Sequence, residues 1–139
     1  MRMRKAKPPD FQTLYKIGLS TPELKVSDNE AFMSRPDFKF AITNKNGLFL
    51  VAEKNGKIIG FAYCYIEGPE YACMVYDVVL PKYRGQGIGK RLIQEKELWL
   101  KKKGVKSAYA LATNQKATSI LKHLGYRKGK QLTWMEKKL

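Results

Sequence analysis

The sequence predicts a mixed α/β fold (α+β), in which a mostly antiparallel central meander is followed by a glycine loop, a helix, a strand, a further helix and terminal strands. Two observations lead to this prediction. Residues 48–80 contain runs rich in β-branched and aromatic residues with turn signals between them. Residues 87–124 contain two amphipathic helical patterns separated by one alternating run. Because 139 residues is the size of one ordinary domain, we expect a single domain over residues 1–139.

The first third of the chain predicts a short strand and several helices. Residues 1–6 can form a strand, which a proline pair ends. Asp10 can cap a helix whose apolar residues recur at helical spacing. Residues 20–46 alternate capping residues with short apolar pieces, so we expect two short helices in a connecting segment.

The central runs predict hairpins. Asn55-Gly56 is the strongest short hairpin signal, since both central residues of a type I′ turn need a positive φ. A second turn is expected at Gly68-Pro69, between the strand that ends at residue 67 and the strand that begins at residue 71.

The second turn predicts a register. If Gly68-Pro69 is a two-residue turn, Glu67 faces Glu70 and Cys64 faces Cys73. We expect two free thiols there, because disulfide geometry is demanding and the expected compartment is reducing.

Two helices and one strand are expected after the meander. The first helix runs from about Gly89 to Gly104, and Asn114 can cap the second. Residues 105–113 alternate strictly and predict a strand, one face of which carries a row of alanines that either a cofactor or a helix approaches closely. Residues 126–137 offer one or two terminal strands.

The charge balance is strongly basic. Lys and Arg number 27 against 12 Asp and Glu, a net charge of +15. This sign favours anionic partners, among them nucleic acid or a phosphate-rich cofactor, although charge runs more often form solvated faces. No secretory signal or membrane-spanning segment is present in the sequence, so we expect a cytoplasmic protein without a membrane partner. Two cysteines and one histidine support neither a disulfide framework nor a zinc site.

The glycine-rich loop at residues 84–89 is the strongest functional signal. Glycines let the backbone approach a phosphate, and the following helix N-terminus presents free N–H groups. A Walker A loop is excluded, because Lys90 is followed by Arg91 instead of Ser or Thr. The dinucleotide fingerprint is also excluded, since it would need glycine where Lys90 stands.

Two stretches resemble one family. The Arg-x-x-Gly-x-Gly pattern of residues 84–89 resembles the acetyl-CoA motif of the GNAT acetyltransferases. Residues 114–126 resemble the second block of that family, with Asn114 three residues before Ala117 and Leu-Gly-Tyr at 124–126. The meander before the loop agrees with the family's fold.

The resemblance implies an acetyl-CoA site. In it, backbone N–H groups of the loop cradle the pyrophosphate, Arg84 supports the turn, and the pantetheine arm lies along the strand that precedes the loop. The implied cofactor-binding residues are Val78, Val79, Leu80, Arg84, Gly85, Gln86, Gly87, Gly89, Lys90 and Asn114.

The resemblance also frames the chemistry. By analogy, a backbone N–H near Val79 binds the developing oxyanion. The candidates for the base that deprotonates the amine are Glu67, Glu70 and Asp77. Asp77 can also be interpreted as a structural, hydrogen-bonded carboxylate.

The proton donor is where the sequence departs from the family. Many members have a tyrosine at the position of Leu121. Tyr126, Tyr109 and His123 are the nearest replacements, and unassisted departure of the thiolate is a further alternative, because a thiol pKa near about 8.5 makes a tolerable leaving group.

The sequence therefore predicts an N-acetyltransferase that acts on a primary amine, which could be a protein N-terminus, a lysine or a small amine. A non-catalytic acyl-CoA-binding sensor is an alternative from another class, and a nucleic-acid-associated basic protein is a third, less favoured one. The amine acceptor is not identified by the sequence, and both a monomer and a homodimer stay open.

Overall fold

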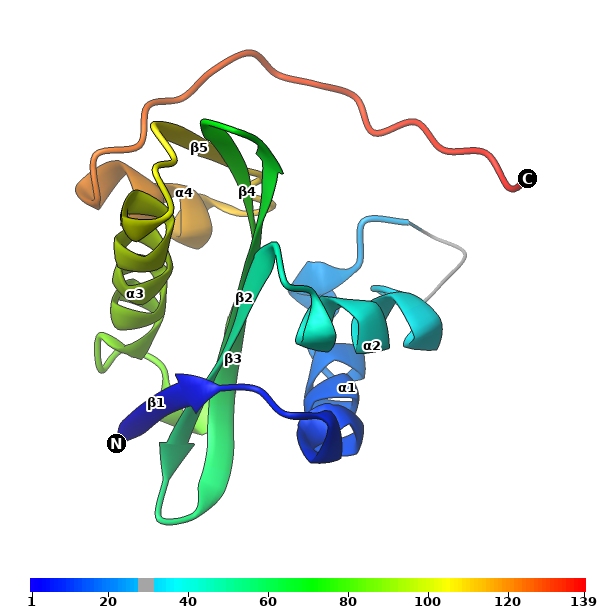
Figure 1. Ribbon diagram of the computed structural model, residues 1–139, viewed down its shortest axis with the longest axis vertical. Coiled ribbons are helices and arrows are strands. Elements are labelled where there is room, and N and C mark those ends of the chain that lie inside the picture. The colour runs from blue at the N-terminus through cyan, green and yellow to red at the C-terminus, as the bar shows by residue number, and fades with distance from the viewer. Residues whose placement is uncertain (28–31) are drawn as a thin grey trace.

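A mixed five-stranded sheet forms the centre of the computed structural model, which describes residues 1–27 and 32–139 (Figure 1). The strand order is β1-β2-β3-β4-β5, and all neighbours are antiparallel except β4 and β5, which are parallel. The strands are β1 (Arg2–Lys5), β2 (Gly47–Lys54), β3 (Lys57–Gly68), β4 (Tyr71–Val79) and β5 (Ser107–Ala110). This topology confirms the predicted mixed sheet with its antiparallel meander.

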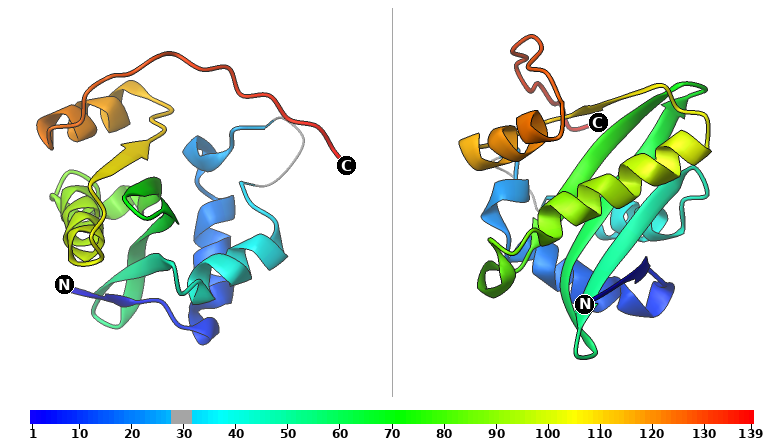
Figure 2. Two further views of the ribbon diagram at one scale, coloured as in Figure 1. Left: turned by 45° about the horizontal axis from the view of Figure 1, so that its top comes forward. Right: turned by 90° about the vertical axis from the view of Figure 1, so that its left-hand side faces the viewer.

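Helices cover both faces of the sheet. α1 and α2 lie against one face, and α3 and α4 lie on the other (Figure 2). The helical elements are η1 (Pro8–Asp10), α1 (Phe11–Leu19), η2 (Pro22–Leu24), α2 (Arg35–Thr43), η3 (Pro81–Tyr83), α3 (Ile88–Lys102) and α4 (Gln115–His123). η2 and α2 are the two short helices expected in residues 20–46, while the part of that prediction on residues 28–31 lies outside the described residues. Within the described chain, no helix has the length and apolar character that crossing a membrane requires.

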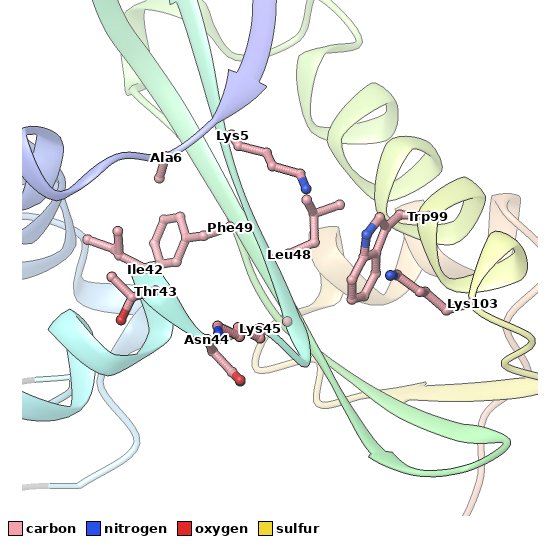
Figure 3. Close-up of a pocket in the computed structure, with 11 residues that line it drawn as sticks. Lys5, Ala6, Ile42, Thr43, Asn44, Lys45, Leu48, Phe49, Trp99 and Lys103 are labelled. Carbon is pink, nitrogen blue, oxygen red and sulfur yellow. The ribbon is translucent and has the colours of Figure 1, made fainter.

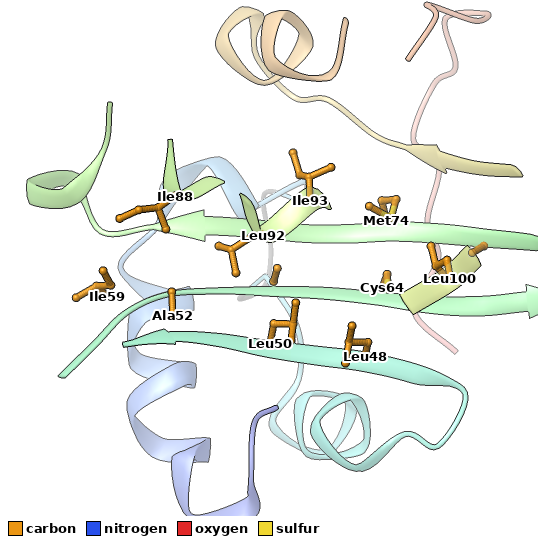
Figure 4. Close-up of a cluster of buried hydrophobic side chains, with 12 residues drawn as sticks. Leu48, Leu50, Ala52, Ile59, Cys64, Met74, Ile88, Leu92, Ile93 and Leu100 are labelled. Carbon is orange, nitrogen blue, oxygen red and sulfur yellow. The ribbon is translucent and has the colours of Figure 1, made fainter. Parts of the chain in front are cut away.

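Each face of the sheet has its own core, because successive side chains of a strand point to opposite faces. Leu48 and Leu50 of β2 pack toward α3, where they meet Leu92 and Leu100 (Figure 4). Phe49 lies between them in sequence and belongs to the aromatic core under α1 and α2. The sheet is therefore buried on both sides.

The first hairpin confirms its prediction. Asn55 and Gly56 both have a positive φ, 51° and 73°, as a type I′ turn requires. The second hairpin differs from its prediction. Gly68 pairs with Tyr71, so the turn residues are Pro69 and Glu70, one position later than expected.

The cysteine pairing that followed from the expected turn is wrong. Cys64 pairs with Met74, and Tyr65 pairs with Cys73. The cause is the later turn, which shifts the pairing by two positions and leaves Glu70 in the turn, where it cannot pair with Glu67. A bulge at Glu67 adds one residue to β3 and reverses one of these two positions. The two thiols are free, as expected.

The C-terminal part of the chain differs from its prediction. β5 comprises Ser107–Ala110, a shorter strand than the predicted 105–113, and residues 126–137 form no strand. A four-residue edge offers few backbone partners, and the basic run at 127–130 has no apolar face to bury. The terminal segment instead crosses one end of the molecule as an extended, exposed chain (Figure 1).

A second bulge shapes the middle of β4. Tyr63 pairs with Tyr76 and Cys64 pairs with Met74, so Val75 has no partner on β3. The bulge coincides with the end of the β4–β5 ladder, whose last pair is Met74 with Ala110. A bulge bends its strand, so β4 turns away from β5 at this point.

A buried lysine stabilises the bulge. The Lys96 side chain of α3 is 0% exposed, and its Nζ lies 3.3 Å from the Tyr63 carbonyl oxygen and 3.0 Å from that of Tyr76. It also forms an ion pair with Asp77, 2.8 Å from Oδ1 and 2.9 Å from Oδ2. One ammonium group thus satisfies the carbonyls that flank the interrupted ladder.

Replacement of this lysine should cost much stability. In Lys96→Met, the Asp77 carboxylate and two backbone carbonyls lose their partner, which we expect to lower the free energy of unfolding by about 3 kcal/mol. Lys101→Met removes an exposed lysine from the same helix and should change it by less than about 0.5 kcal/mol. Urea denaturation of both variants measures the difference, and equal unfolding free energies would contradict the role of Lys96.

Candidate functional site: an open strand edge and a glycine loop

The site begins where β5 leaves β4. The two strands pair only over Tyr71–Met74, so residues 75–79 of β4 have no strand partner on the β5 side. The Leu80 N–H donates to the Ile59 carbonyl across the β3 side, at 2.9 Å. N–H groups of successive strand residues point to opposite sides, so the Val79 N–H points away from β3. It faces the open slot, by which we mean the unpaired edge of β4 along residues 75–79.

The glycine loop continues from the end of this slot. Gly85 and Gly87 have φ values of 76° and 80°, a left-handed backbone that favours glycine. Arg84 and Arg91 donate their N–H groups to the backbone carbonyls of Pro81 and Gly87. Between them, the N–H groups of residues 85–90 have no backbone acceptor in the part of the chain that the structure describes. These free donors at the N-terminus of α3 suit a pyrophosphate.

Arg84 connects the slot to the loop. Its Nε donates to the Val79 carbonyl oxygen at 2.8 Å, and its guanidinium lies 3.5 Å from the Glu23 carboxylate of η2. The side chain therefore holds the end of β4 against the start of the loop. This geometry agrees with the expected support of the turn.

Asn114 acts as a helix cap. Its Oδ1 accepts a hydrogen bond from the Ala117 N–H at 2.9 Å, which fixes the start of α4. At the other end of α4, Leu121 and Tyr126 are partly buried and pack against the core under α3. Burial, followed by the nearby Glu97 carboxylate, raises the pKa of the Tyr126 phenol. The structure thus places Tyr126 in the core under α3, beside Glu97 and near Asp77, whose charge also raises the pKa of the phenol.

Asp77 and Glu67 lie in different surroundings. Both oxygens of Asp77 contact Lys96, on the side of the sheet that α3 covers. Desolvation raises the pKa of the Asp77 carboxyl, and the Lys96 ammonium opposes that shift. The ion pair favours the structural interpretation of this carboxylate, which was the alternative to catalysis.

Glu67 lies on the bulge of β3 within a cluster of tyrosines. Its Oε1 accepts hydrogen bonds from Tyr109 Oη at 2.5 Å and from Tyr65 Oη at 3.1 Å. Tyr71 stacks on Tyr109 with ring centroids 5.3 Å apart. Desolvation is the main cause that raises the pKa of Tyr65, to about 12, so this phenol stays protonated and donates to Glu67 near neutral pH.

This tyrosine cluster borders the open slot. Tyr65, Cys73 and Tyr109 are register partners across β3, β4 and β5, and the β4–β5 ladder ends one residue after Cys73. Tyr109 bonds to both Cys73 and Glu67, and these bonds are the main reason that its pKa is raised. The structure therefore brings Glu67 and Tyr109 together at one end of the slot and the glycine loop at the other.

Two residues of this region escaped the sequence prediction. In the sequence, Tyr65 looks like any aromatic residue of a strand, and its neighbours do not indicate that it would contact Glu67 and Tyr109. Lys96 did have a signal, because it stands four residues after Leu92 and four before Leu100 on the buried face of α3. A lysine at such a position needs a buried partner, and Asp77 was the unexplained carboxylate.

Comparison with known proteins agrees with this geometry. The model of the Acetyltransferase (GNAT) family matches residues 11–126. A mutant protein from Bacillus halodurans has a TM-score of 0.81 and 18% identity, over 99% of this chain and 99% of that chain. No curated protein matches the chain in sequence.

Two further solved structures carry descriptive names. One is a predicted acetyltransferase with acetyl-CoA from Clostridium acetobutylicum, with a TM-score of 0.80 and 17% identity over 97% of this chain and 95% of that chain. The other is an aminoglycoside antibiotic 6'-N-acetyltransferase from Acinetobacter haemolyticus, with a TM-score of 0.78 and 18% identity over 100% of this chain and 99% of that chain. At these identities the likeness shows the fold.

The loop predicts a clear effect of one substitution. Gly87→Val should abolish binding of acetyl-CoA, because a β-branched residue at a φ of 80° forces the backbone of the loop to change. Gly104→Val is the matched control, since Gly104 has a φ of 84° and open space around it, and it follows α3 at the end opposite to the loop. Calorimetry with acetyl-CoA checks both variants. Parent-like affinity in Gly87→Val would contradict the assignment of the loop.

Proposed function

We propose that this chain, which belongs to the GNAT family of acetyltransferases, transfers the acetyl group of acetyl-CoA to a primary amine by direct attack. Membership of the family establishes the acetyltransferase class and the use of acetyl-CoA. The observation that carries the rest of the proposal is the open edge of β4, which leads from the glycine loop to the Glu67 cluster.

The chain's residues fit acetyl-CoA. Free N–H groups of the glycine loop suit the pyrophosphate, and the unpaired edge of residues 75–79 offers backbone hydrogen bonds to a pantetheine arm. The role proposed for Val78, Val79 and Leu80 is this backbone contact. Acetyl-CoA supplies a thioester there, activated for attack by a nitrogen.

A backbone N–H of the open slot is proposed as the oxyanion donor, and it must lie nearer the bulge than the expected Val79. Glu67 lies beside Cys73, which is six residues and about 20 Å along β4 from Val79, too far for both to act on one acetyl group. The Val79 N–H itself points into the slot, where residues 75–79 have no strand partner, and is proposed to contact the pantetheine arm. A backbone donor held by a strand needs no reorganisation when negative charge develops on the acetyl oxygen, which is why such donors stabilise a transition state. The Arg84 contact with the Val79 carbonyl keeps this part of the backbone in place.

Glu67 is proposed as the base. Its Oε1 is held by two tyrosines, while no described group bonds to its Oε2, which is thus available to an amine or to a bridging water. Glu67 accepts the proton that the amine loses as its nitrogen bonds to the acetyl carbon and the thiolate leaves. Asp77, whose oxygens are both engaged by Lys96, and Tyr126, which packs in the core, are proposed as structural residues.

The thiolate departs without a tyrosine at the family position. Leu121 stands there and packs against the core. Tyr109 is the one phenol of the tyrosine cluster that is carried by β5, but its proton is engaged by Glu67. We therefore propose that the thiolate departs without a proton donor, because a thiol with a pKa of about 8.5 is a tolerable leaving group.

Release of free CoA with a panel of amines tests the function. The panel contains a lysine peptide, a peptide with a free N-terminus, small amines and an aminoglycoside, because a neighbour in fold is named for that acceptor. Turnover of at least one amine is expected. Binding of acetyl-CoA without turnover of any amine would favour the non-catalytic sensor, an alternative that the leucine at position 121 already suggests.

The role of Glu67 gives a direct prediction. Glu67→Gln should lower kcat by at least about 100-fold with the amine that is accepted, because it removes the base, and should leave acetyl-CoA affinity unchanged. Glu70→Gln, in the adjacent turn, is the matched control and should keep parent-like turnover. Steady-state kinetics and calorimetry check both. A Glu67→Gln variant with parent-like kcat would contradict the assignment.

A further inference from the structure

A cavity lies away from the site just described. It has a volume of about 290 Å³ and opens between the start of β2, the end of α2 and the last turns of α3 (Figure 3). Trp99 and Lys103 line it, whereas the glycine loop precedes Ile88 at the other end of α3. At 1.5 Å per residue, Trp99 is about 17 Å along the helix from Ile88. The two sites are therefore separate.

The cavity is lined by positive charge. Lys5 at the end of β1, Lys45 after α2 and Lys103 at the end of α3 contribute ammonium groups, and none of the described lining residues carries a carboxylate. The C-termini of α2 and α3 add partial negative charge, but a helix end carries only about half an elementary charge. Three full positive charges outweigh it. An anion is the ligand that this lining favours.

One wall of the cavity is aromatic. The Trp99 ring is partly buried against the core of α3, and the Lys103 ammonium lies 5.7 Å from its centroid. Figure 3 shows Lys5 and Trp99 extending into the space between β2 and α3, with Leu48 between them. An indole beside an aliphatic side chain provides a flat apolar surface, and flat bases stack on such surfaces.

We propose that this cavity is a second ligand site, which takes a phosphorylated ligand of nucleoside monophosphate size. Its phosphate binds among Lys5, Lys45 and Lys103, and its base lies against Trp99. The volume lies at the lower end of the range of small-molecule sites, about 300 to 1,000 Å³, which suits a mononucleotide better than a longer ligand.

Fluorescence of Trp99 tests the proposal. The chain has two tryptophans, so Trp134→Phe leaves Trp99 as the sole indole. AMP should change its emission saturably, adenosine should bind at least about tenfold more weakly, and inorganic phosphate should compete with AMP. Combination with Gly87→Val should leave the AMP affinity unchanged, because the glycine loop is not involved.

Charge removal supplies the control. Lys45→Gln with Lys103→Gln should weaken AMP binding by about tenfold, which corresponds to about 1.4 kcal/mol. Lys57→Gln removes an exposed lysine from the first hairpin and should change the affinity by less than about twofold. No saturable change up to about 1 mM AMP, equal binding of adenosine and AMP, loss of binding in Gly87→Val, or binding of oligonucleotides alone would each overturn the proposal.

Discussion

The ammonium group of Lys96 is the contact on which the shape of the site depends. It is buried between α3 and the sheet, and it bonds to two carbonyls at the bulge of β4 as well as to Asp77. Without a donor at this point, the bulge would leave polar backbone groups unpaired in the core, at a cost of roughly 1–3 kcal/mol each. The bulge in turn ends the ladder with β5, since the last paired residue of β4 directly precedes Val75. A packing detail of the core therefore produces an open strand edge at the surface.

The function follows from what lies along that edge. One end leads into the glycine loop, where backbone N–H groups without a backbone acceptor suit an anion. The other end meets Glu67 and its tyrosines. In the proposed mechanism, backbone groups bind the acyl donor, and side chains select and deprotonate the amine. This division explains how one fold accommodates different acceptors, because strand edges and loops stay constant while the flanking side chains change.

Much of the fold was predictable because its signals are local. The loop at 84–89, the Asn55-Gly56 hairpin and the cap at Asn114 each depend on residues a few positions apart, and each is confirmed. The bulges were not predictable, since a bulge depends on contacts between distant elements and has no fixed residue signature. The later turn and the bulge at Glu67 together place Cys64 opposite Met74, one position from the expected register. The prediction of terminal strands was wrong for a related reason. A strand at 126–137 requires a partner edge, which the short β5 does not provide.

The site was predictable in part. Backbone binding groups follow from the glycine pattern, whereas the partners of Asp77 and Glu67 come from α3 and β5 and emerge only in three dimensions. Amide hydrogen exchange, read residue by residue by NMR with and without CoA, tests the central claim most directly. We expect CoA to protect the amides of residues 85–90 together with that of Val79, because these N–H groups point at the ligand. Protection confined to other parts of the sheet, with Val79 and the loop exchanging as before, would contradict the account.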